Sequence, residues 1–301
     1  MKVAMWLALA ALLVAAQQDD ASRQIWDNYF GASRLPSKTA PSSAPAPRPA
    51  PQYRRVSQPP TSKQVGKAAN AALTQNARGA ALGVTIWKME SPVGGDGARL
   101  LVQEGAGRGR TEYIPHRLEA GTTLREGDLV RLAIETPSDG WLYVIDQEVH
   151  TGDNVGPPYL IFPTTGSRNG DNRVGAARLV EIPAREDKVN VFTIRPTVSG
   201  ERGERLTILF TPQPIPGITP MAGPQELNRA TFESWMTQFR SDSEHFELVD
   251  GLGQSWSIAE KTSGEQGRPL TLDDPAPQTV FVFPEKAGKP VLATVLLRVA
   301  G

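Results

Sequence analysis

The residues best suited to chemistry follow a strand-like segment at positions 141–150. Two carboxylates and an imidazole, those of Asp146, Glu148 and His150, occur at every second position there. Because side chains on an extended strand alternate between its two faces, these three groups should share one face. Together they could hold a divalent metal and support a metal-dependent hydrolase. Solvated polar residues at a strand end give the same pattern, and we therefore expect no bound metal or other cofactor.

A second group of polar residues lies in two turns at positions 151–154 and 168–173. The turns flank the segment 159–165, and we expect them to converge at one end of a sheet. Oxygen-rich loops suit calcium or a polar ligand, although ordinary turn chemistry is the alternative. With two aromatic side chains as further contacts, the predicted ligand-binding residues are Trp141, Tyr143, Asp153, Asn154, Asn169, Asp171 and Asn172.

Complete motifs of nucleophilic catalysis are missing from the sequence. It has no cysteine, which excludes a thiolate nucleophile and a cysteine-bound zinc. The glycines at 105–109 lack the lysine of a phosphate-binding loop, and the segment 253–257 lacks the closing glycine of a nucleophile elbow. We therefore expect a protein without catalytic residues of its own.

Charge gives little indication of a partner. Lysine plus arginine and aspartate plus glutamate number 32 each, so no overall field attracts nucleic acid. A nucleic-acid partner is not expected.

The first 16 residues form a predicted signal peptide. Lys2 precedes an apolar run at 3–16 that ends in the small residues 14–16. The run is shorter than the roughly 20 residues of a membrane span, and no later segment is apolar enough. We expect a mature protein without a transmembrane segment that is secreted or periplasmic.

The next two segments contrast in composition. Ile25, Trp26, Tyr29 and Phe30 would form an apolar stripe on a short amphipathic segment at 17–30, which either packs on its own domain or docks on a partner. Residues 31–78 are rich in proline and basic residues, a composition typical of a linker that does not fold.

From residue 79 to 301 the apolar residues alternate with a period of two, as in half-buried strands. The turn at Asp139 and Gly140 predicts a hairpin between 129–135 and 141–148. Apolar residues at helical spacing predict one amphipathic helix at 224–240, opened by Pro224. The fold class is therefore mainly β, an antiparallel sandwich or barrel-like domain with one helix.

Several spaced motifs resemble the family known as domain of unknown function 4384. They are GVTIW at 83–87, LREGD at 124–128, GWLYVID at 140–146, LIFPT at 160–164, VEIP at 180–183 and LTIL at 206–209, with DPAPQ at 274–278 resembling the ending of some secreted members. The resemblance covers about 81–214 and leaves a helix and a hairpin at 215–301 as an extension. It implies a β-rich module of exported or envelope-associated bacterial proteins without established catalytic residues. Relatives often carry tyrosine near the position of His150, which weakens the metal hypothesis.

These observations favour a secreted, non-enzymatic binding or adaptor module of the bacterial envelope. Its partner would be an envelope or extracellular protein or a glycan that the sequence does not identify. Two alternatives stay open, a metal-dependent hydrolase using Asp146, Glu148 and His150, and an envelope structural protein that assembles through edge strands or the N-terminal stripe.

Overall fold

The computed structural model describes residues 25–36, 51–56, 79–90, 113–119, 121–152, 154–195, 201–249, 267–283 and 288–300. The predicted signal peptide, most of the predicted linker and Asp153 lie outside these ranges. Within them, no helix combines the length and apolar character needed to cross a membrane.

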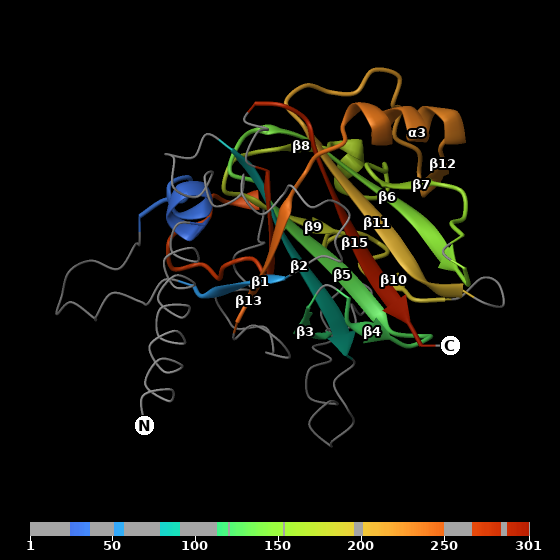
Figure 1. Ribbon diagram of the computed structural model, residues 1–301, viewed down its shortest axis with the longest axis horizontal. Coiled ribbons are helices and arrows are strands. Elements are labelled where there is room, and N and C mark those ends of the chain that lie inside the picture. Colours follow the sequence, from blue (N-terminus) through green and yellow to red (C-terminus); the bar gives the residue numbers. More distant parts are fainter. Residues whose placement is uncertain are drawn as a thin grey trace, which may run out of the picture.

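Two β-sheets build the domain (Figure 1). The first has the order β1-β13-β14-β2-β5-β10, with β3 also paired to β2 and β9 to β5, and all its pairs are antiparallel. Its strands are β1 (Tyr53–Val56), β2 (Ala80–Glu90), β3 (Ile114–Leu118), β5 (Leu129–Glu135), β9 (Leu179–Ile182), β10 (Phe192–Thr193), β13 (Glu244–Leu248) and β14 (Thr279–Phe283).

The second sheet has the order β12-β7-β6-β11-β15-β4, with β8 also paired to β6. Only the pair of β15 with β4 is parallel among its described strands. Its strands are β4 (Thr123–Leu124), β6 (Gly140–His150), β7 (Tyr159–Phe162), β8 (Arg173–Val174), β11 (Glu201–Thr211), β12 (Gln225–Glu226) and β15 (Val291–Val299). A 3-10 turn, η3 (Arg168–Gly170), lies between β7 and β8.

The main core lies between the sheets and follows the period of two in the sequence. Each long strand contributes every second side chain, and those of β2, β6 and β11 are Leu82, Val84, Ile86, Leu142, Val144, Leu206, Ile208 and Phe210. Burying one such side chain contributes about 1.5–3 kcal/mol, so this layer is the main source of stability. The predicted mainly β sandwich is confirmed.

The single predicted amphipathic helix is present as α3 (Arg229–Gln238). The helix covers the outer face of the second sheet (Figure 1), and its Phe232 and Trp235 belong to one buried cluster with Tyr143. The helix starts later than the sequence suggested, because Asn228 Oδ1 accepts a hydrogen bond from Thr231 N at 3.2 Å and caps it. Pro224 instead precedes β12 and does not open the helix.

The hairpin predicted at the turn of Asp139 and Gly140 does not form. β5 and β6 belong to different sheets, so their connection crosses the sandwich. Gly140 does not take the positive φ of a tight hairpin turn. A Cβ at Gly140 would instead lie 2.4 Å from the Phe210 ring, so glycine is needed there for packing.

The N-terminal apolar stripe packs on its own domain. It forms a π-helix, η1 (Trp26–Gly31), and Ile25, Trp26, Tyr29 and Phe30 are buried against the outer face of the first sheet. The segment continues to Leu35, which bridges in parallel to Thr271. The interpretation of the stripe as a packing element is therefore correct for residues 25–30.

Two described parts of the predicted linker at 31–78 belong to the folded domain. Arg34 forms a buried ion pair with Glu135 of β5 at 2.6 Å. Tyr53, with 1% of its surface exposed, lies in β1 opposite Leu248 and donates a hydrogen bond to Pro277 O at 2.9 Å. The linker prediction is wrong for these residues. It was based on the average composition of 31–78, and the prolines on both sides of the short strand dominate that average.

Candidate functional site

The predicted face of β6 exists and lies at one end of the sandwich. Leu142 and Val144 point into the main core, whereas Tyr143 and Ile145 belong to the layer under α3. Because the alternation continues, Asp146, Glu148 and His150 lie on the core-facing side of β6, near its end. All three residues are half-buried. Sequence reasoning therefore placed these three side chains correctly.

The neighbouring strand β11 adds two carboxylates that sequence reasoning missed. Glu204 stands opposite Glu148 in the antiparallel register, and Glu201 stands opposite His150. The register shifts between Glu201 and Gly203, so Glu201 and Glu204 lie on either side of an irregularity in β11. Gly203 allows the close approach of β15 there, because a Cβ on Gly203 would lie 2.1 Å from Leu297 O. The available signal was the pair of glutamates just before the apolar alternation that begins at Leu206.

Carboxylates from β6 and β11 line a cavity of about 260 Å³ between the sheets, which we call the carboxylate cavity. Asp146, Glu148 and Glu204 form its charged wall. The other lining residues are Val130, Leu132, Tyr159, Ile161, Phe192, Thr193, Ile194, Leu206, Pro224 and Leu297. No lysine or arginine occurs among these described lining residues, so the cavity combines negative charge with an apolar wall.

Burial changes the protonation of this wall. Desolvation, together with the charges of neighbouring carboxylates, raises the pKa of Asp146 to about 7 and that of Glu204 to about 9. Asp146 Oδ1 and Glu204 Oε2 are both buried and have no hydrogen-bond partner among the described residues. Because each carboxyl group raises the cost of ionising the other, the two groups titrate as a pair.

A metal ion finds no ready site among the described residues, where no three histidine, aspartate or glutamate side chains are arranged to hold one. His150 Nε2 lies 3.7 Å from Glu148 Oε2, an ion pair when the imidazole is protonated. The three residues of the hydrolase hypothesis share a strand face, but the described residues do not provide the coordination geometry of a metal site.

The second predicted site does not assemble. The turn at 151–154 follows the end of β6, whereas the residues at 168–173 lead into β8, which pairs with Gly140 and Trp141 at the start of β6. Ten residue steps of about 3.3 Å along β6 place the two turns roughly 30 Å apart. Turns on either side of an antiparallel strand lie at opposite ends of it, which the expectation of convergence overlooked.

Several residues of that predicted site make contacts within the fold. Tyr143 is buried, and its hydroxyl accepts a hydrogen bond from Ile215 N at 2.8 Å. Asn172 Nδ2 donates to Leu142 O at 3.0 Å, and Asp171 Oδ1 accepts from Arg173 N at 2.9 Å. The contacts of Tyr143 and Asn172 join β6 to other segments, whereas that of Asp171 is local to the turn before β8.

The remaining members of that set are more accessible. Trp141 is half-buried, with the Arg173 guanidinium 5.9 Å from its ring centre. Asn154 Nδ2 donates to Thr151 O at 3.4 Å, and Asn169 has the left-handed conformation with φ 53°. Asp153 lies outside the described residues. Ligand binding by this set stays a prediction.

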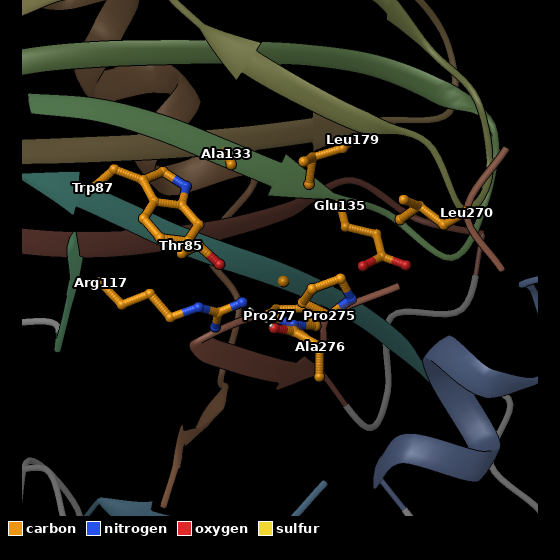
Figure 2. A pocket seen from close by; sticks show the side chains of 11 residues that line it. Thr85, Trp87, Arg117, Ala133, Glu135, Leu179, Leu270, Pro275, Ala276 and Pro277 are labelled. Carbon is orange, nitrogen blue, oxygen red and sulfur yellow. Dashed lines mark hydrogen bonds between the residues drawn. The ribbon is translucent and has the colours of Figure 1, made fainter. Parts of the chain in front are cut away.

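Two other cavities have different properties. Figure 2 shows a small one on the first sheet, where Arg117 and Glu135 point toward the segment 275–277, and its volume of about 20 Å³ holds about one water molecule. A larger, open cavity of about 600 Å³ contains Arg168, Arg173 and Arg178. Its acidic lining residues are Asp139, Asp171, Glu181 and Glu186, so it presents mixed charge.

No family model, no curated protein and no solved structure matches the chain.

Proposed function

We propose that the chain is a non-enzymatic binding module, and that its carboxylate cavity binds a cationic group carried on an apolar stem. The observation that carries the proposal is the lining of this cavity, which sets Asp146, Glu148 and Glu204 opposite apolar side chains of the other sheet. A buried cation requires a carboxylate partner, and its stem gains from apolar contact. The arrangement supplies both.

The size of the cavity limits the ligand. Small-molecule sites usually measure roughly 300–1,000 Å³, and this cavity measures about 260 Å³. It therefore suits one lysine or arginine side chain of a partner protein, or a small amine. Phe192 and Ile161 would contact the stem, while Glu148 and Glu204 would bind the head group.

Export through the predicted signal peptide is part of the same proposal. A lysine or arginine of an envelope or extracellular protein would then be the natural occupant. The resemblance to the family of domain of unknown function 4384 supports this setting, because that family is found in exported proteins. A hydrolase using Asp146, Glu148 and His150 is the second hypothesis, favoured by their shared face.

Benzamidine and benzamide test the proposal, because they share a ring but only benzamidine carries a charge. We expect benzamidine to bind the full mature chain at about pH 8.5 and to raise its melting temperature, since a ligand of the native state at about 100 times its dissociation constant adds about 2.7 kcal/mol of stability. Benzamide should give a far smaller shift.

The control variants locate the binding. Glu148→Gln should weaken benzamidine binding, whereas Glu233→Gln, which removes an exposed charge from α3, should leave it unchanged. Equal binding of benzamide, or no binding of benzamidine, would contradict a cation site. Stabilisation by Zn²⁺ or Mn²⁺ that disappears in His150→Ala would favour the hydrolase instead.

A further inference from the structure

The carboxylate cavity contains an unfavourable arrangement of like charges. Glu148 and Glu204 are directly opposite on adjacent antiparallel strands, where two negative charges destabilise the pairing. Asp146 lies two residues before Glu148 on the same face of β6 and lines the same cavity as Glu148 and Glu204. The three groups cannot all be ionised in a buried space without a proton or a cation between them.

The titratable groups that face this space come from three strands. β6 contributes Asp146 and Glu148, with His150 two residues beyond them at the end of the strand, and β11 contributes Glu204 together with the nearby Glu201. β7 contributes Tyr159, whereas the described lining residues from β5, β10 and β15 are uncharged. The only described group here that gains positive charge on protonation is therefore His150.

We propose that the carboxylate cavity is a pH-regulated cation site, in which one proton shared by Asp146 and Glu204 competes with the bound cation. This regulation rests on the proposed function, because it concerns the same site and the same class of ligand. The proton and the cation perform the same physical task, which is to offset repulsion between carboxylates in a space with little water.

The direction of the effect follows from burial. The pair holds its proton to a higher pH than solvent-exposed carboxyl groups do, because burial disfavours the ionised form. At acidic pH the pair carries one negative charge less and attracts a cation weakly. As pH rises through about 7 to about 9 the proton is lost, and binding of a cation strengthens.

Benzamidine is a suitable probe, because its amidinium group stays charged across this range. We expect its dissociation constant for the full mature chain, measured by calorimetry, to be at least about tenfold smaller at pH 8.5 than at pH 5.5, since close charges in a partly buried site interact strongly. Asp146→Asn removes the carboxyl group whose pKa of about 7 lies between these two pH values, and it should abolish most of this dependence. His150→Gln and Glu233→Gln should preserve it.

The outcomes separate the two proposals. Failure of benzamidine to bind at pH 8.5 contradicts the proposed function itself. Equal binding at both pH values overturns only the regulation. Loss of the dependence in His150→Gln, with its retention in Asp146→Asn, would assign the effect to the imidazole and also overturn the proposal.

A second measurement does not depend on any variant. Carbon NMR of side-chain carboxyl groups in the wild-type chain should show Asp146 and Glu204 titrating together above about pH 6. Titration of both near pH 4, the range of ordinary carboxyl groups, would overturn the shared proton.

Discussion

At the scale of single residues, the sequence shows which side chains share a strand face but does not show their partners across strands. The period of two placed Asp146, Glu148 and His150 together, because it depends only on local geometry. Glu204 joins them through a register fixed by the fold, some 56 positions further along the chain from Glu148. Arg34 and Glu135 are 101 positions apart, and no local pattern connects them.

The ion pair of Arg34 and Glu135 supports a prediction of its own. Both side chains are almost fully buried, and Arg34 also donates to the carbonyl oxygens of Asp274 and Pro275 at 2.6 Å and 2.9 Å. Arg34→Met should lower the free energy of unfolding by about 3–5 kcal/mol, because it leaves the Glu135 charge buried without its partner. Urea denaturation measures the change.

Two further variants serve as controls for this pair. Arg34→Met combined with Glu135→Met should recover much of the lost stability, since no uncompensated charge remains. Arg54→Met breaks an exposed pair with Glu119, where Arg54 has 48% of its side chain exposed, and should cost less than about 1 kcal/mol. An equal loss in Arg34→Met and Arg54→Met would show that burial of the pair has no energetic importance.

At the scale of elements, periodicity gave the long strands and α3, whereas composition and turn motifs failed. The Asp139 and Gly140 turn has the residues of a hairpin, but packing against Phe210 explains its glycine. The short strand β1 lies among prolines, and only its pairing with β13 identifies it. Edge and connection geometry depends on distant chain segments, so a local pattern cannot determine it.

β1 provides a test at this scale. Tyr53→Ala should lower the free energy of unfolding by about 3 kcal/mol, because it leaves a cavity at a fully buried aromatic side chain. Tyr53→Phe removes only the hydrogen bond to Pro277 O and should cost about 1 kcal/mol. Urea denaturation of both variants compares the contribution of the buried aromatic ring with that of the hydrogen bond. Wild-type stability of Tyr53→Ala would mean that β1 contributes nothing to the folded sheet.

Deletion of residues 36–60 should likewise destabilise the domain, contrary to what a linker composition suggests.

At the scale of the whole molecule, strands from the C-terminal part complete both sheets. β14 lies between β13 and β2 in one sheet, and β15 lies between β11 and β4 in the other. The family-like segment 81–214 therefore contains neither of these central strands, although the resemblance suggested an extension. The resemblance rests on short local motifs, which do not show how a later segment inserts between the strands that carry them.

The carboxylate cavity also affects the stability of the whole domain. Groups whose pKa is raised on folding bind more protons in the native state, so the free energy of unfolding decreases as pH rises from about 4 toward about 9. Asp274 acts in the opposite direction at acidic pH, because hydrogen bonds from Arg268 and Thr271 lower its pKa despite partial burial. Its contribution is lost as pH falls through that lowered pKa.

Stability should therefore be greatest at mildly acidic pH and decrease on both sides. On the alkaline side each of the two protons held by Asp146 and Glu204 accounts for a slope of at most about 1.4 kcal/mol per pH unit. Urea denaturation between pH 3 and pH 9 measures the profile. Glu204→Gln should flatten the alkaline side and leave the acidic side unchanged, whereas Glu233→Gln should reproduce the wild-type profile. A wild-type stability that rises steadily from pH 5 to pH 9 would contradict a buried carboxyl pair that shares a proton.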